Sequence, residues 1–292
     1  MSLLNLFQWK HKIFLFLTSL IFITSSCTQS GFNEKRAFYY LTEQVAIGYR
    51  IPGSQASREA SLYISKILEA NGWEVNFQDF IFEGVALRNI VASKSNSNPD
   101  IILGTHYDTR QFSDQEPSQI SQRNPVLGAN DGASGTAVLL ELSHHLDSDS
   151  PNIWIVFFDG EDQGRIDSWP WSVGAEYFAA NLGKYPGKVV IVDMVGDKDL
   201  SIFKEKNSSK DLIDEIWAAA KQAGYEDFFI NEEKHSLIDD HLPFLNRGIP
   251  AALIIDFNYP YWHTNYDDID KVSPDSLRIV GDVLMNWLKI PD

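Results

Sequence analysis

The chain has 292 residues, of which 44% are hydrophobic and 13% are aromatic, so it can bury one large core and is expected to form one folded domain. Its formal net charge is -16, from 40 Asp and Glu against 24 Lys and Arg. A nucleic-acid surface needs clustered basic residues. None are clustered in this chain, so nucleic-acid binding is excluded as its function.

The N-terminal segment has a short basic stretch followed by an apolar run over residues 13–23. This run has the length of a signal-peptide core and is short for a bilayer span. Cys27 follows two serines, so the segment resembles a bacterial lipoprotein signal, although Thr24 stands where such signals usually carry Leu. We expect residues 1–27 to be a signal peptide of the lipoprotein type. The protein would then be exported and anchored by lipid, facing the periplasm or the cell exterior; plain secretion and a retained anchor are the alternatives.

Residues 28–292 are expected to form a single catalytic domain. Two amphipathic helices over Glu34–Ile47 and Gln55–Ala70 come first, followed by two strands that suit a hairpin at the sheet edge, Trp73–Phe80 and Val85–Ala92. Apolar runs then alternate with helical patterns. The expected buried strands are Ile101–Leu103, Ile153–Phe158, Val189–Val192 and Ala251–Ile255, and the expected helices are Ala133–Leu146, Val173–Leu182, Lys210–Ala223 and Ser273–Leu288. This order predicts an α/β fold, an αβα sandwich with a mixed, mainly parallel central sheet. A polar segment over residues 111–124 is expected to be a surface loop.

Seven acidic and histidine residues lie at the carboxyl ends of the expected strands or in the loops that follow them. Open α/β sheets bind their ligands in the crevice beyond the carboxyl ends of the strands. Repeated delivery of carboxylates and imidazoles to that edge predicts a metal site. The seven residues are His106, Asp108, Asp131, Glu161, Asp162, Asp193 and His263.

Three of these residues suit a zinc ion. Cys27 is the only cysteine, so a disulfide and a cysteine-based zinc site are both excluded. Zinc accepts imidazole nitrogen and carboxylate oxygen, and Asp131, Asp162 and His263 would supply these from three separate loops. Taken singly, each has a structural alternative, as a turn residue or a hydrogen-bonded histidine. Glu161 and Asp162 are adjacent at a strand end and point in different directions, so one can hold a metal while the other moves a proton.

Six motifs in this order resemble the zinc-dependent M28 peptidase superfamily and, within it, the glutaminyl-peptide cyclotransferases of the animal type. The motifs are HYDT, GANDGASGTAVLLEL, FFDGED, VVIVDMVGD, DDHLPFLNRGIP and WHTNYDDIDKV. The resemblance runs from about Tyr39 to Leu288. It implies a zinc-aminopeptidase-like fold.

The resemblance also implies a role for each residue. Asp131, Asp162 and His263 would be the zinc ligands and Glu161 the general acid/base. In the superfamily's aminopeptidases, the positions of His106 and Asp193 hold a second zinc, and the residue at the position of Asp131 bridges the two metals. In the cyclotransferases, the residue matching Asp193 belongs instead to a hydrogen-bond network around the acid/base. Asp108 would orient His106.

Two features favour a cyclase. Asp239 begins an Asp-Asp-His sequence where hydrolases of the superfamily commonly have Ser-Asp-His, so it would join the proton network as a catalytic residue. Trp262 precedes His263 as in a Trp-His-Thr signature of the cyclase pocket. Further aromatic residues would add to the substrate pocket or pack in the core: Trp169, Trp171, Tyr259 and Tyr261. Two positions depart from the animal enzymes, which have Glu at the position of Asp162 and His at that of Leu253.

The expected activity is the zinc-dependent cyclisation of N-terminal glutamine, in peptides or proteins, to pyroglutamate with release of ammonia. One zinc ion is expected, and cobalt or manganese could occupy such a site. The alternative is an aminopeptidase with one or two zinc ions, in which Glu161 activates water. A third reading is a surface lipoprotein that binds peptides without turnover.

Overall fold

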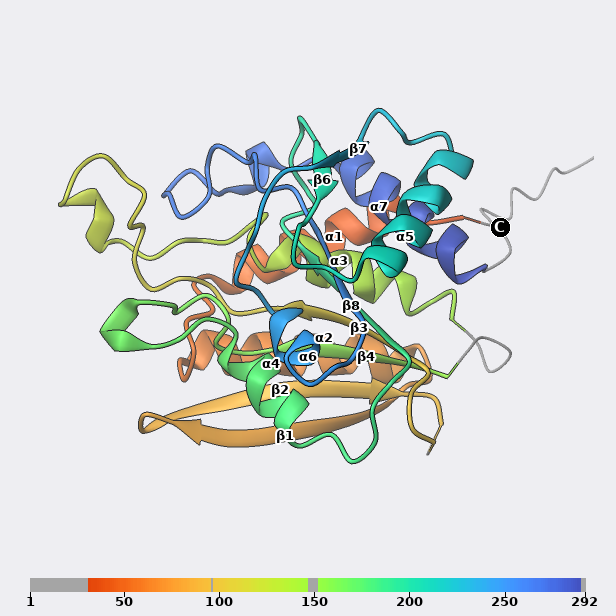
Figure 1. Ribbon diagram of the computed structural model, residues 1–292. Helices are drawn as coiled ribbons and strands as arrows, with labels where there is room; N and C mark the ends of the chain where they lie inside the picture. Colours follow the sequence, from red (N-terminus) through yellow and green to blue (C-terminus); the bar gives the residue numbers. More distant parts are fainter. Residues whose placement is uncertain (1–30, 96, 147–151, 290–292) are drawn as a thin grey trace, which may run out of the picture.

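The computed structural model describes residues 31–95, 97–146 and 152–289, and its centre is a six-stranded mixed sheet (Figure 1). The strand order is β1-β2-β4-β3-β5-β8. The hairpin of β1 and β2 is antiparallel and lies at one edge, and β2 pairs antiparallel with β4. The other pairs, β4-β3, β3-β5 and β5-β8, are parallel. The expected fold class is confirmed. The strands are β1 (Glu74–Phe82), β2 (Val85–Ser93), β3 (Ile101–His106), β4 (Ile153–Phe158), β5 (Lys188–Asp193) and β8 (Ala251–Ile255).

Helices cover both faces of the sheet, because the central strands are apolar on both sides. Val190 and Val192 pack into the larger core, under α1 (Glu34–Ile47), α2 (Gln55–Ala70), α3 (Ala133–Leu142), α5 (Lys210–Gln222) and α7 (Pro274–Leu288). Val189 and Ile191 point the opposite way, toward α4 (Val173–Ala180) and α6 (Leu242–Leu245). Leu253, where the animal enzymes carry His, is buried in this second core.

The close packing of α3 on the sheet brings its N-terminal turn to the carboxyl edge. Every residue of α3 is buried. A Cβ atom on Gly135 would lie 2.3 Å from the carbonyl oxygen of Val192 and 2.4 Å from Thr105 Oγ1, so only glycine lets the helix approach this closely. The turn before α3 reverses at Gly132, whose φ is 98°, and carries Asp131. The small residues of GANDGASG therefore place a carboxylate above the sheet.

The elements follow the sequence expectations closely, with three differences. β3 and β5 run on to include His106 and Asp193, so these residues end their strands instead of following them. α3 ends at Leu142, four residues before the expected end. A two-stranded sheet of β6 (Ile202–Lys204) and β7 (Phe229–Glu233), together with α6, was not predicted, because three to five residues are too few to show a period.

The expected signal peptide, with Cys27, lies outside the described residues. Within the residues that the structure describes, no helix combines the length and the apolar character needed to cross a membrane.

Candidate metal centre

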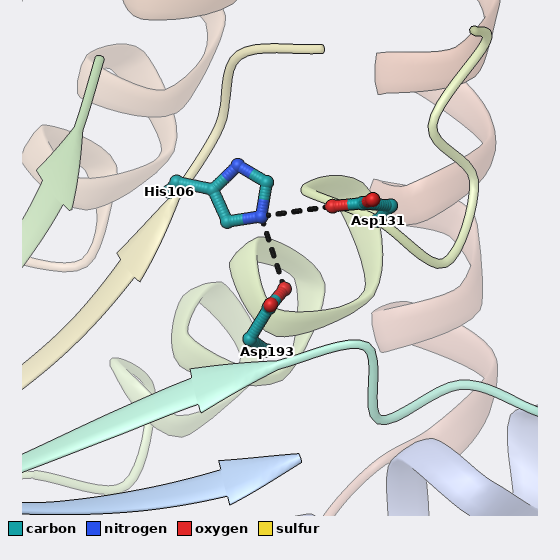
Figure 2. A group of neighbouring side chains, drawn as sticks. All are labelled: His106, Asp131 and Asp193. Carbon is teal, nitrogen blue, oxygen red and sulfur yellow. Dashed lines mark hydrogen bonds and ion pairs between the residues drawn. The ribbon is translucent and has the colours of Figure 1, made fainter. Parts of the chain in front are cut away.

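Five buried side chains form two groups of potential metal ligands that share Asp131. In the first group, His106 Nε2 lies 3.1 Å from Asp131 Oδ1 and 3.0 Å from Asp193 Oδ1 (Figure 2). In the second, His263 Nε2 lies 2.9 Å from Asp162 Oδ1 and 3.7 Å from Asp131 Oδ2. The potential ligand atoms of each group all lie within 4.8 Å of one another. The structure thus brings together the three expected zinc ligands and the two residues expected at a second zinc.

The donor atoms fit a divalent cation. Asp131 Oδ2, both carboxylate oxygens of Asp162 and His263 Nε2 are buried and make no hydrogen bond within the described part of the chain. Buried polar atoms that make no hydrogen bond raise the free energy of the folded protein. Burial and the nearby Asp131 raise the pKa of Asp162 above its ordinary value. A cation between these atoms would relieve both costs, and an imidazole and carboxylate donor set suits zinc.

The backbone is strained at His263 and at the residue after Asp193, and both His263 and Asp193 are potential metal ligands. His263 itself has a φ of 55°, and Met194, which follows Asp193, has a φ of 45°. Side chains other than glycine rarely adopt this left-handed region, and each such residue costs roughly 1–3 kcal/mol. The His263 ring stacks on Trp262, with 3.8 Å between ring centroids. This contact packs the His263 turn, and Met194 is buried in the second core.

Asp108 fixes the turn that carries Glu161 and Asp162. Its two carboxylate oxygens accept hydrogen bonds from the backbone N–H of Glu161 (3.1 Å) and of Asp162 (3.2 Å), and a longer one from the Gln163 amide (3.3 Å). Its Oδ1 also lies 3.5 Å from His106 Nδ1. His106 Nδ1 makes no hydrogen bond within the described residues, so the orienting role of Asp108 stays a prediction. The two backbone contacts add a second role, which is to aim both acidic side chains.

Asp267 fixes the turn that carries Asp131, and it was not predicted from the sequence. Its oxygens accept from the backbone N–H of Asn130 (2.8 Å) and Asp131 (3.0 Å), and from the Tyr259 hydroxyl (2.8 Å). Burial and the nearby Asp131 raise the pKa of Asp267 to about 7. Tyr259 was expected in the substrate pocket, but the structure places it elsewhere. It is 3% exposed and supports Asp267, because its hydroxyl needs a buried acceptor.

Asp114 and Arg110 were also missed, and they hold His263. Asp114 Oδ1 lies 3.0 Å from His263 Nδ1. Arg110 donates to both oxygens of Asp114, at 3.0 and 2.7 Å, and to the carbonyl of Asp162 at 2.9 Å. Burial alone would raise the pKa of Asp114, but the hydrogen bonds from His263 and Arg110 hold it below its ordinary value. An ionised Asp114 fixes the tautomer in which His263 Nε2 is free to bind a metal. Asp114 belongs to the 111–124 loop, which does lie beside the site.

We predict that Asp114→Ala lowers zinc affinity by about 10–100-fold, the usual effect of losing a carboxylate that orients a ligating histidine. Competition with a chelator of known affinity measures this change. Gln119→Ala, at an exposed position of the same loop, is the matched control and should bind zinc like the unmodified protein. Unchanged affinity in a folded Asp114→Ala protein would show that Asp114 does not orient a metal ligand.

A cavity of about 250 Å³ opens above the ligands, and the predicted catalytic residues Glu161, Asp193 and Asp239 all line it. Glu161 Oε1 accepts a hydrogen bond from Ser172 Oγ at 3.3 Å. Burial and the charge of Asp239 raise the pKa of Glu161 well above its ordinary value. Burial and the charge of Asp193 do the same for the pKa of Asp239. A buried carboxyl with a raised pKa suits general acid/base chemistry near neutral pH.

The aromatic wall of this cavity differs partly from expectation. Trp262 and Trp171 line the cavity, whereas Trp169 does not. Trp169 packs edge-on against Phe82, with 5.0 Å between centroids. Trp169 adopts an extended conformation, whereas Ser168 and Ser172 have left-handed backbones. Because the backbone changes direction along this segment, Trp171 lies in the cavity wall and Trp169 packs against Phe82.

Comparison with known proteins agrees with this geometry. The model of peptidase family M28 matches residues 89–288. The structure of Bacteroides thetaiotaomicron glutaminyl cyclase bound to N-acetylhistamine is 31% identical and covers 90% of this chain and 99% of that chain, with a TM-score of 0.83. A leucine aminopeptidase precursor from the same species is 32% identical, with 90% and 98% covered and a TM-score of 0.83. The glutaminyl-peptide cyclotransferase of Bothrops jararaca is 25% identical over 288 residues, covering 82% of this chain and 77% of that protein. This chain therefore belongs to peptidase family M28 and is similar both to glutaminyl cyclases and to an aminopeptidase of the same fold.

Proposed function

We propose that the protein is a glutaminyl-peptide cyclotransferase, which converts the N-terminal glutamine of peptides or proteins to pyroglutamate and releases ammonia. One observation carries the proposal: Glu161, Asp239 and Trp262 line a single cavity with the ligand residues Asp131, Asp162 and His263. Asp239 and Trp262 are the two features by which the sequence resembles cyclases more than hydrolases. The similarity to the Bacteroides and Bothrops enzymes supports the same choice.

The residues of the cavity suit each part of the reaction. The α-amine of the substrate attacks the γ-carbonyl carbon of the same glutamine and forms a C–N bond. The bond between this carbon and the side-chain amide nitrogen breaks, and that nitrogen leaves as ammonia. Zinc, when bound by Asp131, Asp162 and His263, supplies Lewis acidity to that carbonyl. Glu161 takes a proton from the amine and hands it to the departing nitrogen. Burial and the charge of Asp239 disfavour ionisation of Glu161 and keep the pKa of Glu161 high, and burial and the charge of Asp193 have the same effect on the pKa of Asp239. Trp171 and Trp262 line the cavity, and apolar walls that limit the entry of water would favour cyclisation over hydrolysis.

An aminopeptidase is the second candidate, and one observation favours it. His106, Asp131 and Asp193 form a second complete group of ligand atoms beside the first. Two tightly bound zinc ions would favour a hydrolase, in which Glu161 takes the proton of water instead of an amine. A metal count on the purified protein bears on this choice.

The decisive assay offers matched peptides that begin with Gln or with Leu. We expect the Gln peptide to lose ammonia and the Leu peptide to stay intact, because only the Gln side chain carries an amide that the α-amine can displace. Mass spectrometry separates the two products. Release of free Leu without any pyroglutamyl product would overturn the cyclase proposal and support the aminopeptidase.

We also propose that the protein acts outside the cytoplasm, held by a lipid on Cys27. This proposal rests on the N-terminal sequence alone. Labelled palmitate fed to expressing bacteria should appear in the protein and be lost in Cys27→Ser. Equal labelling of both proteins would contradict an anchor at this residue.

A further inference from the structure

A second cavity lies next to the candidate active site and differs from it in character. It measures about 520 Å³ and lies between the end of β1, α4, α6 and the loop before α6. Its walls are largely apolar: Ile81, Phe82, Val173, Tyr177, Leu242 and Pro243. Trp171, Ile238 and Asp239 line both this groove and the catalytic cavity. The two spaces are therefore neighbours that share a wall.

The apolar groove is open to solvent at its rim. Ile81 is 75% exposed, Ile238 is 62% exposed and Tyr177 is 37% exposed. Large apolar side chains gathered around one groove mark a binding surface more often than single scattered ones. Tyr177 stacks on Phe80, with 4.2 Å between nearly parallel rings, so this part of the wall is packed in place.

Trp171, one residue of the shared wall, is in contact with other groups on three sides. Its ring stacks on His263 with 5.9 Å between centroids, and Arg110 lies over it at 5.0 Å. A Cβ atom on Gly164 would lie 2.0 Å from Trp171 Cδ2, so the indole rests directly on the glycine backbone. Trp171 therefore packs beside His263 and also lines the groove.

The charges favour an apolar occupant. The acidic residues that line the groove are Glu176 and Asp239, and Glu176 is paired with Arg247 at 2.7 Å. The described residues that line the groove include no lysine or arginine, so an acidic side chain would face carboxyl groups without a basic residue among them. The catalytic cavity, in contrast, has several carboxylates that suit a positively charged α-amine.

We propose that the groove holds the residues that follow the N-terminal residue of a peptide substrate, and that it selects large apolar or aromatic side chains at the second and third positions. This inference rests on the proposed function to the extent that a peptide N-terminus enters the catalytic cavity. Trp171, Ile238 and Asp239 line both spaces. This favours a peptide whose N-terminal residue lies in the catalytic cavity over a second copy of the chain, which would cover the groove without using that cavity.

The test compares kcat/KM for Gln-Phe-Phe and Gln-Ala-Ala peptides. We expect the unmodified protein to prefer the aromatic peptide about tenfold, mainly through KM, as burial of part of one aromatic side chain allows. Ile81→Glu, at an exposed position of the groove, should lose this preference. Leu62→Glu, 55% exposed on α2, is the matched control and should keep the preference. Equal rates on both peptides, or a preference that survives Ile81→Glu, would overturn the inference.

A binding arm separates failure of this inference from failure of the proposed function. If neither peptide is cyclised, the proposed activity is wrong. The Kd of each peptide for Glu161→Gln, whose groove is unchanged, still measures whether the groove prefers aromatic side chains. Tighter binding of the aromatic peptide that is lost on adding Ile81→Glu supports the groove, and equal binding overturns it. Sedimentation gives the remaining outcome. If Ile81→Glu changes the mass of the protein in solution and leaves the peptide preference intact, the groove is an interface between copies and the inference is wrong.

Discussion

Glu161→Gln is expected to lower kcat on a Gln-initiated peptide by about 10²–10⁴-fold, the usual contribution of a positioned general acid/base. Gln has nearly the same shape as Glu and can still accept the hydrogen bond from Ser172 Oγ, but it cannot take up or release the proton. KM should change little, because the metal ligands and cavity walls stay in place. Initial rates of ammonia release measure the effect.

Zinc content is the internal control for this variant. Glu161 belongs to neither group of ligand atoms, so Glu161→Gln should bind as much zinc as the unmodified protein. Glu232→Gln, at an exposed position on β7, is the matched control and should keep full activity. Turnover that survives Glu161→Gln would assign the proton transfer to another group. If both proteins bind the peptide and neither shows detectable turnover, a peptide-binding module is the better explanation.

The sequence predicted the central sheet and the ligand-bearing turns well, for a physical reason. A strand buried on both faces must be apolar throughout, so Ile153–Phe158 and Ala251–Ile255 are visible as uninterrupted runs, and their observed bounds are the expected ones. Carboxylates interrupt such runs at the carboxyl edge, which made Asp162 and Asp193 conspicuous.

The supporting residues could not be found in this way. Asp114 contacts a histidine 149 positions away, and Asp267 contacts backbone N–H groups 136 and 137 positions away. Such contacts leave no local period, and a buried Asp and a surface Asp look the same in a sequence. Asp267 does lie within the WHTNYDDIDKV motif, which was its one available signal.

The prediction of the aromatic residues in the pocket was partly wrong for a different reason. Which tryptophan faces the cavity depends on backbone direction, and the segment from Arg165 to Ser172 contains four left-handed residues that are not glycine. Propensity rules assign this conformation to glycine, so no rule applied to the sequence would have separated Trp171 from Trp169.

Asp131→Ala is expected to abolish both activity and zinc-dependent stabilisation, because Asp131 is the residue common to both groups of ligand atoms. A ligand that binds only the folded state stabilises it by about 4 kcal/mol at a thousand times its Kd. The unmodified protein should therefore show a rise in Tm on adding zinc, and Asp131→Ala should show little or none. Without metal, the variant is expected to be less stable than the unmodified protein, because it loses the carboxylate that lies 3.1 Å from His106 Nε2, and removal of one partner of a buried ion pair is destabilising.

His106→Ala is the informative companion to Asp131→Ala, because it removes a residue of one group only. If a single zinc is held by Asp131, Asp162 and His263, His106→Ala should keep most of the zinc-dependent rise in Tm and bind the same number of ions. If two zinc ions bind, the count should fall from two to one, and the aminopeptidase becomes the better proposal. Retention of the full zinc effect by Asp131→Ala would contradict both arrangements, since neither group is complete without that carboxylate.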